Sequence, residues 1–249
     1  MKSYLIILII FPFFCFSQTN TIDKKGLKQG AWAKYYPDNK TPIYTGQFKD
    51  NMPIGEFRYF FSSGKVKAII QHQAKNNLSY AWLYYENEQL MAEGRYKYMK
   101  KDSLWINYNS QGYVLSREEF QADKLNGLRV TYYLEGQGEG EEKMLTIENY
   151  KDSLLEGSYE SFYSKGLVKE KGNYVKNKKE GEWQTFHPNG VMESRMTFKN
   201  NLAHGWAYGF DPKGKLYGKK MHRNGVLLEG EELDNYLKNC EKNGIDPNN

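Results

Sequence analysis

The sequence predicts an all-β protein: an elongated, twisted, single-layer antiparallel meander of about eight β-hairpin repeats, with a short C-terminal capping helix. Three observations predict this fold. Aromatic residues make up 16% of the 249 residues, with 21 Tyr and 5 Trp, and aromatic side chains are enriched in strands. A segment of about 24 residues recurs along the chain, which is typical of repeat architectures. Before the C-terminus, no stretch shows the period of an amphipathic helix.

The recurring segment is clearest in GEWQTFHPNG (181–190). Taking Gly181 as the start of one unit, equivalent starts follow one another at intervals of 23 to 30 residues. A residue pattern that recurs at such an interval indicates one supersecondary unit per repeat. The eight starts are Gly30, Gly55, Tyr80, Ser103, Gly127, Gly157, Gly181 and Gly205.

Aromatic residues recur at three fixed positions of the unit. All eight units have one five residues after the start, from Tyr35 to Phe210, and six of eight have one seven residues before the next start. In six of the eight units an aromatic residue also stands two residues after the start, and we call this position the ring row. Rings at equivalent positions of neighbouring units can pack together and hold the units in register. The ring row contains Trp32, Phe57, Trp82, Trp105, Tyr159 and Trp183.

Each unit contains two runs of six or seven residues, separated by polar turns such as Pro188-Asn189-Gly190 and Lys199-Asn200-Asn201. Short runs bounded by such turns predict hairpins, giving about 16 strands. A repeat that contacts only its neighbours forms a quasi-one-dimensional array, and strands twist against each other. The ring row and the position three residues later lie on opposite faces of a regular strand. Alternatively, a bulge at the start residue turns one of them round.

The first 17 residues predict a signal peptide. Lys2 precedes the apolar run Tyr4–Phe16, which is too short to span a bilayer, and the polar stretch SQTNT follows. We place cleavage before Gln18; lipid attachment at Cys15 is the alternative. Residues 18–29 are an N-terminal lead-in and residues 30–226 the repeat array. The protein is therefore expected to be exported, to the periplasm or the outside of the cell.

Residues 227–249 depart from the repeat pattern. Leu233, Leu237 and Cys240 stand at near-helical spacing before Asn243-Gly244, which predicts a helix over 228–242 that caps the last hairpin. A helix that docks a partner is the alternative. Cys240 is the only cysteine left after signal removal, so no internal disulfide can form, and we expect its thiol on the packed face of the helix.

Charge argues against several partners. The net charge is +5, falling to +4 once Lys2 is removed, and the basic residues are spread along the chain. Export and this scatter argue against a nucleic-acid partner. Membrane association would need a clustered basic face, so it is only weakly supported. We expect a monomer whose partner is another protein or a component of the cell envelope.

The sequence shows no catalytic signature. The glycines recur at the repeat interval and do not cluster into a phosphate-binding loop, no pair of histidines has metal-ligand spacing, and no cofactor is predicted. His72 and His222 lie in or beside an aromatic position, where packing is their expected role. Glu56, Glu160 and Glu182 could supply paired carboxylates for an enzyme acting on glycans. Cross-strand pairing with lysine is the simpler interpretation.

Two features are candidate binding sites. One is the exposed side of the ring row, whose six residues could receive an extended partner, a glycan or an apolar patch; the alternative is that these rings pack only on one another. The other is the acidic, glycine-rich stretch LEGQGEGEEK (134–143), which lengthens one interval to 30 residues. It could be a recognition loop or a weak cation site. It could equally be a flexible loop that the fold tolerates. Its acidic residues are Glu135, Glu139, Glu141 and Glu142.

These units resemble the MORN-repeat superfamily (membrane occupation and recognition nexus), and more closely its bacterial variant. GEWQTFHPNG (181–190) and GSYESFYSKG (157–166) fit the G-x-W-x-x-Y-Y pattern followed by a turn. The likeness covers roughly residues 24 to 228. It implies a ribbon of hairpins that serves as a scaffold or binding surface, and bacterial members are often labelled antitoxin-like. The pattern departs from the family at Tyr80, Ser103, Arg129 and Ala207.

The sequence therefore predicts a non-enzymatic exported repeat protein that acts as a binding scaffold. A glycan-acting enzyme or a glycan-binding module, using strand carboxylates and aromatic rows, is the alternative.

Overall fold

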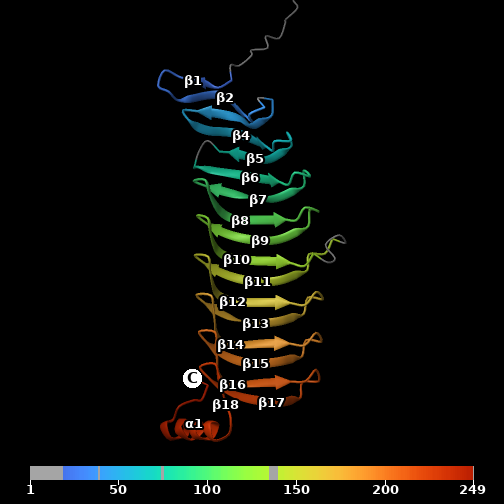
Figure 1. Cartoon of the computed structure of the whole chain (residues 1–249), viewed down its shortest axis with the longest axis vertical. Coiled ribbons are helices and arrows are strands. Elements are labelled where there is room, and N and C mark those ends of the chain that lie inside the picture. Colours follow the sequence, from blue (N-terminus) through green and yellow to red (C-terminus); the bar gives the residue numbers. More distant parts are fainter. Residues whose placement is uncertain (1–18, 39, 74–75, 135–139, 249) are drawn as a thin grey trace, which may run out of the picture.

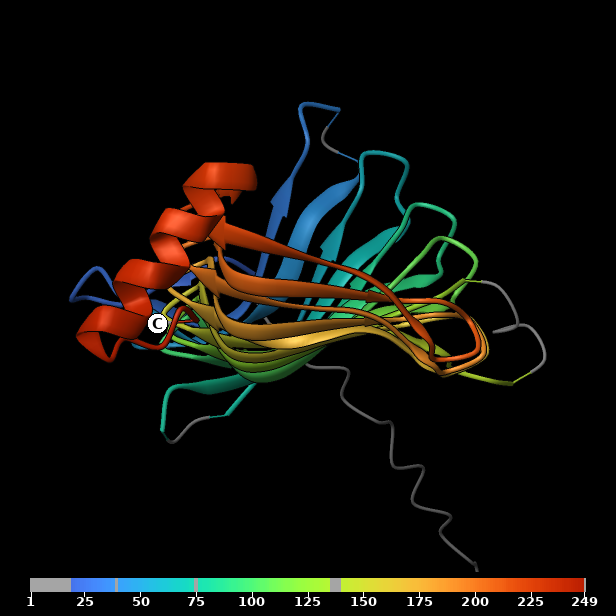
Figure 2. The same ribbon diagram turned by 90° about the horizontal axis from the view of Figure 1, so that it is seen from below.

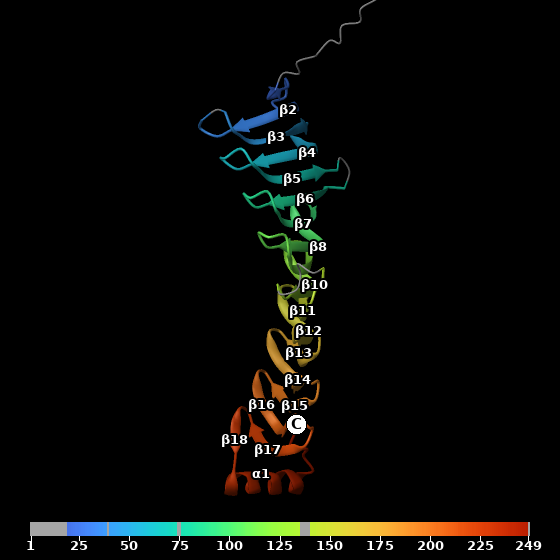
Figure 3. The same ribbon diagram turned by 90° about the vertical axis from the view of Figure 1, so that its right-hand side faces the viewer.

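The computed structural model describes residues 19–38, 40–73, 76–134 and 140–248. In this part of the chain eighteen strands and one helix are found. Every strand pairs antiparallel with the next strand in sequence. The molecule is thus one open meander, stacked in chain order along its long axis (Figure 1). Turned views show that the sheet is narrow, curved and twisted (Figures 2 and 3). The predicted signal peptide lies outside the described residues.

The prediction of about 16 strands falls short by two, because β1 precedes the first hairpin and β18 follows the last. The lead-in expected over 18–29 contains β1 and the beginning of β2. The strands are β1 (Thr21–Ile22), β2 (Lys28–Tyr35), β3 (Pro42–Lys49), β4 (Met52–Phe60), β5 (Val66–His72), β6 (Leu78–Tyr84), β7 (Leu90–Lys97), β8 (Lys100–Tyr108), β9 (Val114–Gln121), β10 (Lys124–Tyr132), β11 (Met144–Lys151), β12 (Leu154–Phe162), β13 (Val168–Val175), β14 (Lys178–Phe186), β15 (Met192–Lys199), β16 (Leu202–Phe210), β17 (Leu216–Arg223) and β18 (Val226–Leu228).

The turns between units bond to the unit before them. Asn200 and Asn201, between β15 and β16, both have left-handed φ angles, 51° and 71°, as tight hairpin turns of this class require. The Asn201 amide donates to the Lys179 carbonyl at 3.0 Å, and the Asn201 side-chain oxygen accepts from the Lys179 amide at 2.6 Å. Asn51 makes the same two contacts with Lys28. The recurring turn asparagine therefore links units as well as reversing the chain.

A bulge stands at the start of most units. Lys171 pairs with Gln184 and Asn173 with Glu180, so three residues, 181–183, lie opposite the single residue Gly172. Gly181 takes a φ of 71° there, which glycine adopts at little cost.

Aromatic rows lie on both faces of the sheet, which decides between the two alternatives left open by the sequence. Trp183 packs on Tyr174 of the neighbouring strand, with ring centroids 5.0 Å apart. Phe186, three residues later, faces the other way. Its ring centre lies 5.5 Å from the ammonium of Lys171, a residue paired with Gln184 and therefore on the face opposite Trp183. The bulge does not bring the two rows to one face.

The third unit starts one residue earlier than the sequence pattern indicates. His72 pairs with Ser79 and Ile70 with Ala81, with no bulge between β5 and β6. Ala81, which is 0% exposed, therefore occupies the place of the ring-row residue. Trp82 points to the opposite face, where its ring lies 4.7 Å from that of Tyr80. The Trp82 position was assigned wrongly because an aromatic run, YAWLYY, offers two registers that differ by one residue.

The C-terminal helix α1 (Gly230–Asn243) forms as predicted, beginning two residues later than expected. Gly244 ends it with a left-handed φ of 62°, and Cys240 is buried with 3% exposure. Figure 1 shows α1 at the end of the sheet, beyond β17 and β18. The following tail returns to β16, where the Asn248 side chain accepts from the Trp206 amide at 3.1 Å. Among the described residues, no helix has the length and apolar character needed to cross a membrane.

Candidate functional site

The ring row is largely interior. Phe57, Trp105 and Trp183 are 2%, 0% and 3% exposed, so a ligand could reach their rings only by displacing the side chains around them. Trp32 and Tyr159 are half-buried on the same face, whereas Trp82 is half-buried on the other. The structure therefore gathers five of these six candidate residues into one row and leaves little of that row accessible.

A glycine lies against each of the most buried rings. A Cβ built on Gly172 would overlap the Trp183 indole, and the same holds for Gly94 against Trp105 and Gly46 against Phe57. These glycines stand nine residues before the starts of their units. Sequence reasoning missed these glycines, although the sequence has a glycine nine residues before the start in each of the three units. They give the ring room to lie flat on the neighbouring backbone.

A lysine covers the ring in three units. The Lys179 ammonium lies 3.9 Å from the Trp183 ring centre, Lys101 lies 4.3 Å from that of Trp105, and Lys28 lies 4.5 Å from that of Trp32. Each of these ammonium groups also lies near the next aromatic ring along the sheet. Cations are attracted to aromatic faces. These contacts close the row to solvent, and burial lowers the pKa of Lys101.

One unit replaces the glycine and the ring by charges. Glu118 stands at the glycine position and Arg129 at the ring position, with 3.2 Å between Arg129 Nε and the Glu118 carboxylate. Glu148 lies 3.5 Å from the same guanidinium on the other side. This arrangement explains why Arg129 departs from the repeat pattern: an ion pair occupies the space of an aromatic ring on a glycine.

The acidic loop is partly tied to the sheet. Glu142 forms an ion pair with Arg117 at 2.5 Å, and this guanidinium lowers the pKa of Glu142. Glu141 lies 3.2 Å from Lys143 and its side chain is 65% exposed. Glu135 and Glu139 lie outside the described residues. In the described part of the chain, no three His, Cys, Asp or Glu side chains gather as a metal site would require.

Two of the strand carboxylates share a surface hollow. Glu160 and Glu182 line a depression of about 220 Å³ over β12–β14, together with Tyr159 and Lys171. Lys171 lies directly opposite Glu160 across the strands, as a cross-strand charge pair would. Glu56 pairs with Arg58 at 2.6 Å on an exposed surface.

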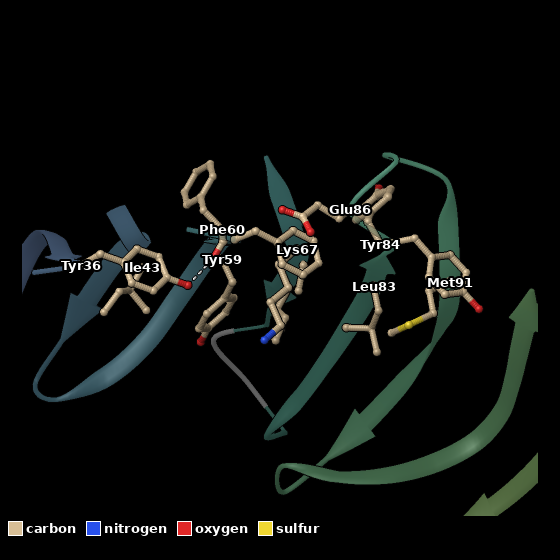
Figure 4. A pocket seen from close by; sticks show the side chains of 13 residues that line it. Tyr36, Ile43, Tyr59, Phe60, Lys67, Leu83, Tyr84, Glu86 and Met91 are labelled. Carbon is tan, nitrogen blue, oxygen red and sulfur yellow. Dashed lines mark hydrogen bonds between the residues drawn. The ribbon is translucent and has the colours of Figure 1, made fainter. Parts of the chain in front are cut away.

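A largely apolar groove with a volume of about 570 Å³ lies across β3–β7. Figure 4 shows side chains from three successive units lining it side by side. We call it the N-terminal groove. It is lined by Tyr36, Ile43, Tyr59, Phe60, Phe61, Lys67, Ala68, Ile70, Leu83, Tyr84, Tyr85, Glu86 and Met91.

The floor of the groove is one strip of cross-strand pairs. Tyr59 lies opposite Ala68, and Leu83 lies opposite Ala92 in the next unit. Further along the sheet the same strip becomes polar, and its pairs are joined by side-chain hydrogen bonds. These pairs are Asn107–Ser116 at 3.0 Å, Thr131–Thr146 at 2.7 Å and Thr185–Ser194 at 2.7 Å.

Tyrosines fix the rim of the groove. The Tyr36 hydroxyl donates to the Phe60 carbonyl at 2.9 Å, and the Tyr85 hydroxyl donates to the Tyr108 carbonyl at 2.9 Å. Tyr133 and Tyr163 repeat this contact farther along. The hydroxyl of one unit therefore bonds to the backbone of the next. Sequence reasoning missed these contacts. Tyr36, Tyr133 and Tyr163 directly follow the all-aromatic position and were read as part of the same run, and Tyr85 was placed in that position itself because the third unit was read one residue late.

One cation lies in the groove. The Lys67 ammonium is 5.7 Å from the Phe61 ring centre, and no ion-pair partner of Lys67 is found in the described part of the chain. Burial raises the pKa of Tyr59, so its hydroxyl stays protonated. The groove thus combines an apolar floor with one cation, Lys67, and one carboxylate, Glu86.

The residues that the structure describes form one open meander of linked hairpins, which is the architecture of a repeat protein. The comparison with known families agrees: residues 179–200 match the MORN repeat variant. The matched segment covers β14, the following turn and β15. It supports a MORN-type repeat, which fits a repeat-based binding scaffold, and proteins built from such repeats are generally non-enzymatic. No curated protein matches the chain.

Proposed function

We propose that this is an exported, non-enzymatic scaffold that binds an apolar segment of another protein or of an envelope component in the N-terminal groove. The observation that carries the proposal is the change along the strip. Three later units fill it with small polar pairs that bond to each other, whereas Tyr59, Leu83 and their partners leave an open apolar hollow. Contiguous apolar surface of this kind marks interaction sites.

The lining indicates the chemistry of the bound segment. Tyrosine rings provide rigid apolar contact area at low entropic cost, and Lys67 adds one charge that a partner carboxylate could neutralise. The partner segment should therefore be apolar with an acidic group near its centre. Neutralisation of a co-expressed toxin would be one form of such binding. Export rests on the predicted signal peptide.

Affinity capture from envelope fractions tests the proposal when two matched variants accompany the natural protein. Leu83→Asn with Ala92→Ser installs in the groove the polar pair that the next unit carries. Thr185→Ala with Ser194→Ala changes the equivalent pair far from the groove. We expect one partner to co-purify with the natural protein and with the second variant and to be lost with the first. A partner retained equally by all three would contradict binding in the groove.

The hollow that holds Glu160 and Glu182 supports the alternative, a glycan-acting or glycan-binding surface. Hydrolysis of envelope polysaccharide by the purified protein, abolished by Glu160→Gln or Glu182→Gln, would favour the enzyme. Binding of glycan without hydrolysis, lost with Lys171→Ala, would favour the binding module.

A further inference from the structure

The last long strand of the sheet, β17, is paired along only part of its outer edge. β16 pairs with it from Leu216 to His222, whereas β18 pairs only with Met221, His222 and Arg223. Among the described residues, no strand therefore pairs with residues 216–220 on their outer side. A strand edge in this state carries a row of unpaired backbone N–H and C=O groups. Figure 1 shows α1 and β18 beyond the left-hand end of β17 and open space beyond its right-hand end.

The open edge arises where the chain leaves the repeat pattern. In the preceding unit β15 is paired with β16 as far as Ser194–Gly209, and Gly218 is the counterpart of Ser194 one unit later. β18 ends at Leu228, because the chain then turns into α1. The next strand is thus cut short, and its missing part would lie opposite residues 216–220.

The opposite end of the sheet is covered further. β1 pairs with the beginning of β2, and the Asn20 amide donates to the Ala31 carbonyl at 2.8 Å. The Asn20 side-chain oxygen accepts from the Ala33 amide at 2.9 Å, so local contacts reach Ala33. In β17, by contrast, residues 216–220 are all exposed, whereas an interior strand such as β13 alternates between exposed and half-buried residues.

The open edge is strongly basic. Between Phe210 and Asn224 a single acidic residue stands among five basic ones. In the part of the chain that the structure describes, none of the five has an ion-pair partner. Such a cluster of cations attracts an acidic partner and repels a basic one. The five are Lys213, Lys215, Lys219, Lys220 and Arg223.

This charge argues against a second copy of the chain as the strand that completes β17. Two β17 edges would bring their lysines together, and β2, at the other end of the sheet, carries Lys28 and Lys34 and no acidic residue. Lysines on an edge strand prevent pairing of this kind. The same lysines favour a strand with acidic side chains, because opposite charges on facing strands stabilise their pairing.

We propose that the outer edge of β17 at residues 216–220 binds an extended acidic segment of another protein by β-strand addition. Backbone hydrogen bonds provide affinity in this mode, and side chains select the sequence. Lys219 and Lys220 point to opposite faces of the sheet, so acidic side chains on either face of the added strand meet a cation. Leu216 and Tyr217, 46% and 73% exposed, add apolar contact area. The N-terminal groove lies toward the other end of the sheet, so the two sites are independent.

Fluorescence anisotropy with a labelled synthetic peptide of alternating glutamate and valine tests the site. We expect the natural protein to bind this peptide. The same peptide with its central valine replaced by proline keeps its charge and loses a backbone donor, so it should bind at least about tenfold more weakly. A peptide of alternating lysine and valine should not bind. Hydrogen exchange at residues 216–220 should slow when the acidic peptide is bound.

Two double variants with the same change of charge separate the edge from the rest of the surface. Lys219→Glu with Lys220→Glu should abolish binding. Lys165→Glu with Lys169→Glu alters β13 and the turn before it, where the strand is paired on both sides, and should bind as the natural protein does. Circular dichroism should show both variants folded.

Equal binding of the proline-containing peptide would show attraction by charge alone and would overturn the proposal. Unchanged hydrogen exchange at residues 216–220, no binding of the acidic peptide, or equal loss of binding in both double variants would overturn it as well.

Discussion

Two neighbouring regions of the sheet, β4–β7 and β8–β15, share one scaffold and differ in what they expose. From β4 to β7 the strip of cross-strand pairs is apolar and open, whereas from β8 to β15 most of its pairs are small, polar and hydrogen-bonded. Buried rings on glycine, turn-to-turn bonds and tyrosine bonds recur in both regions. The contacts that hold the units together are thus separate from the strip of cross-strand pairs, which varies between units. Binding is expected at this variable strip.

The largest expected effect is the loss of stability when a buried aromatic ring is removed, and comparing this loss tests whether the two regions pack their rings in the same way. Phe57→Ala in the first region and Trp183→Ala in the second should each lower the free energy of unfolding by about 3–5 kcal/mol, because each removes a buried ring and leaves a cavity. Urea unfolding measures both. Trp82→Ala, on the opposite face and half-buried, should cost distinctly less. Equal costs for all three would refute the assignment of Trp82 to the other face.

The next largest effect is expected from substitutions of the glycines that lie against the buried rings. Gly46→Ala and Gly172→Ala place a Cβ into the Phe57 and Trp183 rings, which should cost about 1–3 kcal/mol in either region. Gly218→Ala is the control, because its Cβ would meet nothing within 4 Å. Urea unfolding of the three variants decides the matter. If Gly172→Ala were as stable as the control, the ring would not depend on that glycine.

The tyrosine bonds offer a reciprocal pair of changes. Tyr163→Phe removes the bond from the Tyr163 hydroxyl to the Phe186 carbonyl and should cost about 0.5–1.5 kcal/mol. Phe61 occupies the equivalent position in the N-terminal groove and has no hydroxyl. Phe61→Tyr should therefore raise the free energy of unfolding by part of this amount. Thermal unfolding of both variants measures the changes. A destabilising Phe61→Tyr would show that the two regions place this residue differently.

The smallest expected effect is a pH dependence confined to the first region. Because burial lowers the pKa of His72 below 6.5, the unfolded chain takes up a proton there before the folded chain does. Stability from this residue is complete above pH 6.5 and is lost as the pH falls toward the lowered pKa. His72→Phe should remove that part of the dependence. Urea midpoints between pH 7.5 and pH 5 provide the measurement.

The fold was predictable because its determinants repeat. Aromatic columns, turn asparagines and the C-terminal helix with Cys240 each left a periodic or local signal, and the structure agrees with them. The third unit was placed one residue late because Trp82 looks like a ring-row residue, and only the strand pairing of Ala81 shows otherwise. Periodicity cannot distinguish two registers within a continuous aromatic run.

The candidate site was much less predictable. The sequence left open whether the ring row is accessible or packs only on itself, because the exposure of a ring depends on the side chains that lie over it. Lys101 and Lys179 cover their rings from a position four residues away, and Gly94 and Gly172 admit them from the neighbouring strand. The N-terminal groove arises from the opposite cause: Leu83 and Tyr59 face small partners that leave space. Such differences depend on side-chain volumes across strands, which a single-strand pattern does not contain.

Fluorescence of a dye that binds apolar surfaces tests the central comparison most directly. The natural protein should bind the dye in the N-terminal groove. Leu83→Asn with Ala92→Ser should lose most of the fluorescence, and Asn107→Leu with Ser116→Ala, which extends the apolar strip by one unit, should raise it. Unchanged fluorescence in both folded variants would show that the strip does not form the accessible apolar surface of this protein.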